Sequence, residues 1–186
     1  MKGVIFTGFL DLVDDKFGAH TTEEIINKAE LPSGGAYTAV GTYDHSEMFK
    51  LVSLLSESTG IDVPDLLTVF GRFLFGHLIK NYPHVVEGID DCLDFIEVLE
   101  RVIHPEVLKL YPNAELPSFK ATRIAPDQLE LIYNSPRCLA GVAEGLIQGC
   151  ADHFNQQATI TTEALPGPAG SAVKFHIQCV NAVVPA

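Results

Sequence analysis

The sequence has few basic residues and no long apolar run, and each absence excludes a class of function. There are 12 lysines and arginines against 24 aspartates and glutamates, which gives a formal net charge of −12. A nucleic-acid-binding protein needs a basic surface to displace counterions from phosphates. An anionic membrane surface would also repel an acidic chain, and no apolar stretch reaches the length of a membrane span. We therefore expect neither a nucleic-acid ligand nor a membrane partner.

The motifs of the common enzyme classes are also missing. We find no P-loop, no dinucleotide-binding glycine motif and no recognisable pair of nucleophile and base, so we expect no enzymatic activity. No two cysteines have Cys-x-x-Cys spacing among Cys92, Cys138, Cys150 and Cys179. We interpret them as buried thiols, and a zinc site is possible only if the fold gathers distant residues.

Length and composition favour one folded domain. The 186 residues are 47% apolar, which is enough to bury a core. We expect a single domain over residues 1–186. The apolar opening is followed at once by Asp11, Asp14 and Asp15 and has no small-x-small cleavage site. We therefore predict a buried first helix rather than a signal peptide, and a cytoplasmic protein.

The residue pattern predicts helices in the first part of the chain and strands in the second. Thr21-x-x-Glu24 is a capping box, Ser46 is a candidate N-cap, and Gly60 is a candidate helix terminator. The expected helices span residues 3–16, 22–30, 46–59, about 62–81 and 88–111. The expected strands span residues 119–124, 129–133, 158–162 and 173–180, with a further helix starting at 135–136. The fold class is therefore α+β, with a helical region to about residue 112 and a small antiparallel sheet packed with helices over 113–186.

Two glycines lie inside one predicted helix. Gly71 and Gly76 each cost about 0.5–1 kcal/mol relative to alanine at such positions. Close packing against another helix would offset that cost, and so would close approach to a flat cofactor. The sequence leaves both explanations open.

His104 is the histidine with the most unusual setting. It precedes Pro105, and proline disfavours helical geometry at the residue before it. His104 should therefore lie at a kink or helix junction, where its side chain can leave the ordinary helix surface. Because imidazole is the commonest metal ligand, His104 is a candidate ligand.

Tyr133, Ser135 and Arg137 form a Tyr-x-Ser-x-Arg cluster. Alternating residues lie on one side of an extended segment. Two hydroxyls and a planar guanidinium fork suit a ligand with carboxylates, and the N–H groups of a helix starting here would add to that preference. The alternative is that Arg137 pairs with a carboxylate of the protein and Tyr133 caps a strand.

Together these motifs are similar to those of a known family. With Met1-Lys2-Gly3, Phe70-Gly71, His104-Pro105, Pro117 and the Tyr-x-Ser-x-Arg cluster, the chain resembles the H-NOX family over nearly its whole length. These haem nitric oxide/oxygen binding domains are bacterial relatives of the haem domain of soluble guanylate cyclase. The resemblance implies a haem b group buried between the helical region and the sheet region.

The resemblance also implies residue roles. His104 would be the proximal iron ligand. Tyr133, Ser135 and Arg137 would hold the propionates, while Pro117 and Ile5 press on the porphyrin from two sides. The residues matching the distal pocket are Phe9, Leu74, Leu78, Val142 and Leu146.

The implied function is gas sensing. Nitric oxide would bind ferrous iron, His104 would be released, and a separate protein such as a histidine kinase or a cyclic-di-GMP enzyme would receive the signal. Oxygen-binding members of the family have a distal tyrosine where this chain has Val142. The resemblance thus implies binding of nitric oxide, weaker binding of CO and little binding of O₂, unless His77 turns inward as a donor.

Two further expectations follow. Some relatives carry a Cys/His zinc site near the C-terminal sheet, but the region after Thr161 offers His176 and Cys179 without a cysteine cluster, so we predict no zinc. The alternative function from another class is a histidine phosphotransfer module with His104 as phosphoacceptor. That alternative requires an exposed His104 and leaves the Tyr-x-Ser-x-Arg cluster without a role.

Overall fold

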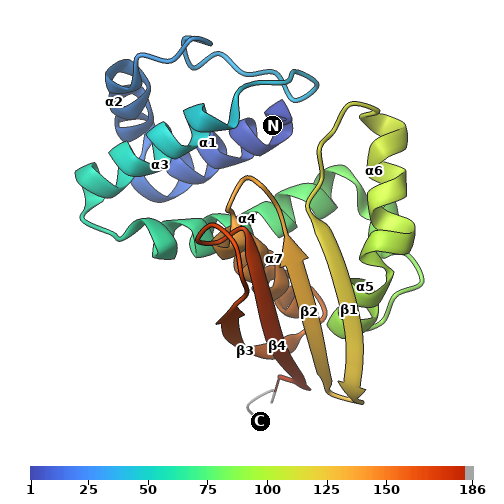
Figure 1. Cartoon of the computed structure of the whole chain (residues 1–186). Coiled ribbons are helices and arrows are strands. Elements are labelled where there is room, and N and C mark those ends of the chain that lie inside the picture. Colours follow the sequence, from blue (N-terminus) through green and yellow to red (C-terminus); the bar gives the residue numbers. More distant parts are fainter. Residues whose placement is uncertain (183–186) are drawn as a thin grey trace. The chain divides into compact units, whose positions relative to one another are not determined.

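The computed structural model describes residues 1–182, and it places helices first and a small antiparallel sheet later (Figure 1). This order confirms the predicted α+β class. The chain divides into two compact units, Met1–Phe70 and Gly71–Ala186, and each is described by itself. The boundary between the units falls inside helix α4 (Val63–Asn81).

The first unit consists of three helices and the beginning of a fourth. The helices are α1 (Gly3–Phe17), α2 (Ala19–Ala29), α3 (His45–Thr59) and the first residues of α4. One face of α1 is buried because Phe6, Phe9 and Val13 recur at three- and four-residue steps. The ring of Phe9 meets Phe70 edge to face, with ring centroids 5.3 Å apart. The apolar opening segment is therefore a buried helix, as predicted.

Two predicted helix caps are wrong, although the helices themselves form. Helix α2 begins at Ala19, so Thr21 lies inside it and its Oγ1 donates to the carbonyl oxygen of Phe17 at 3.0 Å. Helix α3 is capped by Asp44, whose carboxylate accepts from the backbone N–H of Ser46 at 2.8 Å. An aspartate carboxylate two residues earlier satisfies the free N–H better than Ser46 can. Gly60 ends α3 in a left-handed conformation with φ of 73°, as predicted.

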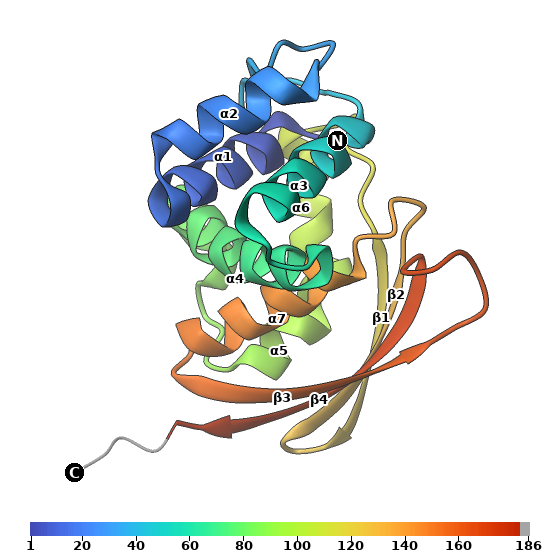
Figure 2. The same ribbon diagram turned by 90° about the vertical axis from the view of Figure 1, so that its left-hand side faces the viewer.

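The second unit contains the sheet and the remaining helices. After α4 come the elements η1 (Pro83–Val86), α5 (Cys92–Val98), η2 (Leu99–Ile103), α6 (His104–Leu110), β1 (Ser118–Ala125), β2 (Gln128–Asn134), α7 (Ala140–His153), β3 (Gln156–Ala164) and β4 (Ala172–Asn181). The strands are antiparallel in the order β1-β2-β4-β3. Helices α5 and α7 cover one face of this sheet (Figures 1 and 2).

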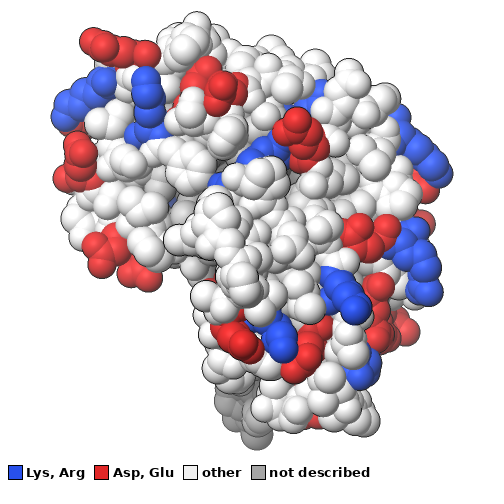
Figure 3. Space-filling model, viewed as in Figure 1, with Lys and Arg blue, Asp and Glu red and all other residues white. Residues whose placement is uncertain are grey.

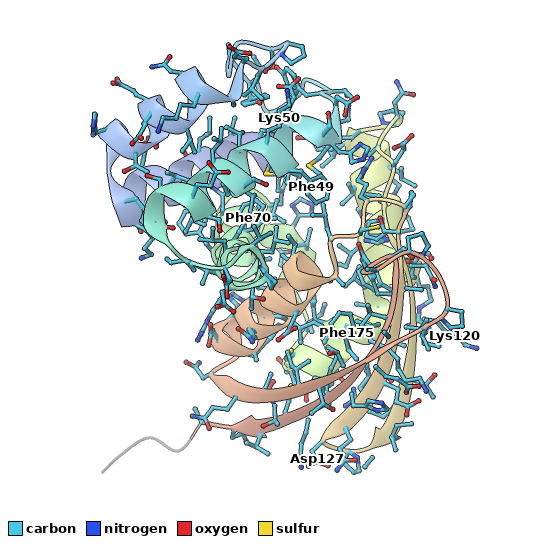
Figure 4. The ribbon with its side chains drawn as sticks, turned by 60° about the vertical axis from the view of Figure 1, so that its left-hand side comes forward. Phe49, Lys50, Phe70, Lys120, Asp127 and Phe175 are labelled. Carbon is cyan, nitrogen blue, oxygen red and sulfur yellow. The ribbon has the colours of Figure 1, made fainter. Side chains whose placement is uncertain are left out.

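The core of the second unit comes from alternating residues of the two central strands. Leu131 of β2 pairs with Phe175 of β4, and Tyr133 pairs with Val173. All four side chains are buried, because residues two apart on a strand share a face. Figure 4 shows Phe175 directed towards the covering helices, whereas Lys120 of β1 points away from them.

The cysteines are free thiols, as expected, but they are not all buried. Cys92, Cys150 and Cys179 lie in the core of the second unit. Cys138 is half-buried in the turn before α7, where its backbone has a positive φ of 54°. The prediction of burial is therefore wrong for Cys138, because this residue belongs to a surface turn rather than to a packed element.

Close helix packing accounts for one of the two glycines in α4. A Cβ atom on Gly71 would lie 2.2 Å from the carbonyl oxygen of Val142 in α7. Gly149 of α7 is also constrained, because its Cβ would lie 2.7 Å from the carbonyl oxygen of Arg72. The helix-packing explanation is thus confirmed for Gly71. Gly76 is exposed and its Cβ would meet no protein atom within 4 Å, so the helix-packing explanation is wrong for it. Close approach to a flat cofactor stays a prediction.

Surface charge and helix length relate to the expectation that the protein binds neither nucleic acid nor a membrane. On the face viewed in Figure 3, acidic and basic side chains are interspersed and no continuous basic surface appears. Among residues 1–182, no helix combines the length and the apolarity needed to cross a bilayer.

Candidate functional site

His104 stands at the junction between η2 and α6, as the Pro105 argument predicts. The helical stretch expected over residues 88–111 is interrupted here by one π-helical turn, in which the N–H of His104 donates to the carbonyl oxygen of Leu99, five residues back. Pro105 has no N–H to continue an α-helical ladder, and the wider turn accommodates this loss. π-Turns of this kind are frequent at functional sites.

The imidazole of His104 is largely buried and has a defined partner. Its side chain is 13% exposed, and Nδ1 lies 3.3 Å from Oε1 of Glu100. Burial lowers the pKa of His104, and the Glu100 carboxylate acts in the opposite direction. The ring is therefore neutral at neutral pH, as a metal ligand must be. Because Nδ1 faces Glu100, Nε2 is the nitrogen available to a further ligand.

The phosphotransfer alternative fits this burial poorly. A phosphoacceptor histidine must meet the active site of another protein, so it has to be exposed. His104 is instead covered in part by Phe119, with ring centroids 5.6 Å apart.

Tyr133 and Ser135 lie where β2 leads into the turn before α7. Tyr133 faces the covering helices, and its hydroxyl oxygen accepts from the N–H of Leu139 at 3.2 Å. Burial raises the pKa of Tyr133. The phenol therefore stays protonated, and its O–H can donate a hydrogen bond. Ser135 is buried, and its Oγ accepts from the N–H of Arg137 at 3.2 Å.

The helix expected to start at Ser135-Pro136 begins later, at Ala140. Residues 135–139 form a turn that includes the left-handed Cys138. The predicted contribution of helix N–H groups next to Ser135 is therefore wrong. A proline can open a turn as readily as a helix, and the local pattern does not distinguish the two.

Arg137 binds a carboxylate of the protein itself. Its guanidinium donates to the backbone carbonyl of Glu115 at 2.5 Å and to Oε2 of the same residue at 2.7 Å. This is the structural alternative stated for the cluster. However, the side chain of Arg137 is 14% exposed whereas that of Glu115 is 84% exposed. The guanidinium is thus largely covered by the protein, whereas the carboxylate that it binds lies at the surface.

The same contact positions Pro117. Glu115 lies in the segment between α6 and β1, two residues before Pro117, which itself directly precedes β1. Arg137 therefore tethers the segment that carries the proline. The ring of Phe119 stands between the two halves of the site, 5.6 Å from His104 and 5.5 Å from Tyr133.

These residues fit a haem group by their chemistry. The second unit brings together a neutral imidazole, an aromatic ring, two hydroxyls and a carboxylate-binding fork from four separate segments. A haem group needs an axial nitrogen ligand and donors for its propionates, and this set supplies both.

The predicted distal residues of the second unit lie on two helices in close contact. Leu74 and Leu78 follow Gly71 at helical spacing on α4, and Val142 and Leu146 are one turn apart on α7. All four are apolar, and Leu74 and Val142 are buried. Ile5 and Phe9 share a face of α1 in the first unit, and their roles at the site stay predictions.

His77 of α4 is a polar side chain that could add a hydrogen-bond donor beside these apolar residues. Its ring stacks against Phe73 on the same helix, with centroids 6.4 Å apart and planes 30° apart. A role of His77 as a donor in the distal pocket stays a prediction.

Three residues of the site were missed from the sequence. Glu100 stands four residues before His104, a spacing at which helical side chains meet, and this signal could have found it. Phe119 follows Pro117 closely and could have been suspected as a ring neighbour. Glu115 gives no such signal, because its contact with Arg137 joins residues 22 positions apart.

The described residues form no second metal site by the arrangement of their side chains. Within the described residues 1–182, no three His, Cys, Asp or Glu side chains are arranged to hold a metal ion. The absence of zinc stays a prediction for elemental analysis.

A largely buried imidazole and a carboxylate-binding guanidinium in one α+β unit suit a haem-binding domain, and comparisons with known proteins show the family. The chain matches the family described as Haem-NO-binding over residues 2–162. It is 38% identical to the H-NOX protein of K. algicida, solved in the unliganded Fe(II) state, with a TM-score of 0.91 and complete coverage of both chains. It is 32% identical to the H-NOX protein of S. oneidensis solved in the Fe(II)NO state, with a TM-score of 0.89, covering 97% of this chain and 100% of that one.

A third solved relative is the H-NOX protein of Shewanella woodyi, bound to IWP-051 in the Fe(II)CO state. It is 39% identical, has a TM-score of 0.81, and the match covers 100% of this chain and 97% of that one. No curated protein matches significantly. The chain belongs to the haem-NO-binding (H-NOX) family, whose members are haem-based gas sensor domains and are generally not enzymes.

Proposed function

We propose that residues 1–186 act as a single sensor domain that binds haem b, responds to nitric oxide and signals to a separate protein. One observation carries the proposal. A buried neutral imidazole at His104 is linked through Phe119 to Tyr133, beside the carboxylate-binding fork of Arg137. The residues proposed as axial ligand and as propionate clamp are thus parts of one site.

The residues of this site have distinct proposed roles. His104 binds iron through Nε2, while Tyr133, Ser135 and Arg137 hold the propionates by donating to their oxygens. Pro117, anchored through the bond from Arg137 to the backbone carbonyl of Glu115, would press on the porphyrin, and Ile5 would press on it from another side. Haem held by these residues would supply an iron atom that binds nitric oxide and would then bind His104 less firmly.

The response of the protein follows from where His104 stands. It is the first residue of α6, directly after the π-turn η2. As long as His104 is held, α6 and η2 are held with it. Its release frees both elements to move against β1, and the separate protein reads that movement.

The apolar distal residues determine gas preference in this proposal. Bound O₂ carries negative charge on its outer oxygen and needs a hydrogen-bond donor, which nitric oxide does not. Phe9, Leu74, Leu78, Val142 and Leu146 offer no donor. We therefore expect nitric oxide to bind tightly, CO more weakly and O₂ least. The Fe(II)NO and Fe(II)CO states of the S. oneidensis relative support binding of both gases.

The proposed receiver of the signal is a histidine kinase or a cyclic-di-GMP enzyme in the cytoplasm. The net charge of −12 suits a partner with a basic docking surface. Histidine phosphotransfer by His104 is not favoured, because burial of the ring opposes it.

Absorption spectra of the reduced protein test the proposal. We expect an intense haem band, a large change on adding nitric oxide, and no oxygenated spectrum in air. His104→Gly should retain haem only with added imidazole, whereas His176→Gly, at an exposed histidine of β4, should behave as the wild type. A colourless wild type or a stable oxygen complex would refute the proposed function.

A further inference from the structure

One carboxylate oxygen of Glu100 contacts both the imidazole of His104 and the backbone of β1. Oε1 of Glu100 lies 3.3 Å from Nδ1 of His104, and the same oxygen accepts from the backbone N–H of Phe119 at 2.5 Å. Phe119 also places its ring against the imidazole. Glu100 therefore connects the turn that carries His104 to the first residues of β1.

The local backbone accounts for this arrangement. Glu100 and His104 are four residues apart across η2, so their side chains leave the turn on the same side. Neighbouring carboxylates are used differently. Glu97 is bound by Arg123, and Glu106 is bound by Lys109. Glu100 is the carboxylate of this stretch that meets the imidazole.

We propose that Glu100 is a positioning residue for His104, which fixes the ring tautomer and sets the strength of the bond from Nε2 to iron. The inference rests on the proposed function, because it assumes that His104 is the proximal ligand. A carboxylate that accepts the Nδ1 proton keeps the Nε2 lone pair available for the metal and makes that nitrogen more basic. A more basic ligand holds iron more firmly.

Glu100 thereby sets how readily His104 is released. With the carboxylate present, the bond to iron is strong and release requires the full effect of nitric oxide. Without it, the ring is free to turn and the bond is weaker. Loss of such a partner typically lowers metal affinity or activity by roughly 10- to 100-fold. The effect is local, because Glu100 is tied by its second contact to the backbone of β1 rather than to another charge.

Resonance Raman spectroscopy of the reduced, unliganded protein measures the bond directly. The iron–histidine stretching frequency should fall from wild type to Glu100→Gln, and fall further in Glu100→Ala. Glutamine keeps a neutral acceptor whereas alanine removes it, so this grading separates the effect of charge from that of shape. Glu106→Gln, at a carboxylate bound by Lys109, is the matched control and should leave the frequency unchanged.

The outcomes separate this inference from the function on which it depends. A wild type without an iron–histidine band would overturn the proposed function. A normal wild-type band that is unchanged in both Glu100 variants would overturn only the role of Glu100. If the variants do not fold, nitrogen NMR of the haem-free wild type decides. A ring protonated at Nδ1 supports the inference, and a ring protonated at Nε2 refutes it.

Discussion

Two glycines of the same helix allow a matched test of why α4 and α7 lie so close together. Gly71→Ala introduces a methyl group 2.2 Å from the carbonyl oxygen of Val142, and within 2.9 Å of the backbone at Gly145 and Leu146. These are backbone atoms, so no side-chain rotation relieves the clash and the two helices must separate. Gly76→Ala introduces the same group into open space.

The two substitutions should have opposite effects on stability. Overpacking of this kind costs about 1–3 kcal/mol, which lowers the melting temperature of a protein of this size by about 2–12 °C. At Gly76, alanine removes backbone freedom from the unfolded chain and should stabilise by about 0.5–1 kcal/mol. That gain corresponds to an increase of about 1–4 °C.

Thermal unfolding followed by circular dichroism, with all proteins prepared with the same haem content, measures both changes. Two outcomes would contradict the packing argument. One is that Gly71→Ala melts at or above the wild-type temperature, and the other is that the two variants shift in the same direction. The haem spectrum of Gly71→Ala should also change, because Val142 and the proposed distal residue Leu146 both lie at the contact that the methyl group disturbs.

Three further predictions concern charged residues. Arg137→Ala should weaken haem binding by roughly 10- to 100-fold in a haem-transfer assay, because charge-assisted hydrogen bonds are lost. The control Arg123→Ala breaks another ion pair of the second unit and should bind haem normally. Glu47→Ala should destabilise the protein by about 1–3 kcal/mol in urea unfolding, because two hydroxyls that donate to this buried carboxylate lose their acceptor; an unchanged midpoint would contradict this. Burial raises the pKa of Glu144 above 4.5, so the folded state binds the proton of this carboxyl group more tightly than the unfolded state. The stability of the wild type therefore falls as the pH rises above that value. Glu144→Gln should therefore gain stability relative to wild type between about pH 4 and about pH 7, and a constant difference in melting temperature would exclude the effect.

Most of the fold was predictable because local signals and tertiary packing agree. The alternation of Leu129, Leu131 and Tyr133 predicts a strand with one buried face, and β2 has that face. The left-handed Gly60 likewise ends α3 where the sequence places it. The caps of α2 and α3 were misplaced because serine, threonine and aspartate compete for the same role over a few residues. The choice between them depends on which backbone N–H remains unpaired.

The site was predictable as a set of residues but not as a set of contacts. The setting of His104 follows from Pro105 alone, since proline acts on its immediate neighbour. The partner Glu100 is indicated by its i, i+4 spacing from His104, whereas Glu115 reaches Arg137 only because the segment before β1 folds back on the turn after β2. Contacts between distant segments are decided by the tertiary fold, so composition and spacing do not reveal them.

The pairing of Arg137 with Glu115 does not argue against a propionate clamp, although it is the contact that the structural alternative predicts. A structural ion pair and a propionate clamp differ in which of the two side chains is shielded from water. The Arg137 side chain is 14% exposed, whereas the Glu115 side chain is 84% exposed. Exposed ion pairs contribute little to stability, so Glu115 loses little when its carboxylate returns to solvent. Arg137 does require a carboxylate, because a charge held away from water is costly when unpaired. In the proposed site, exchange of Glu115 for a propionate would keep that requirement satisfied, and the binding of haem would replace one pair by another instead of breaking one.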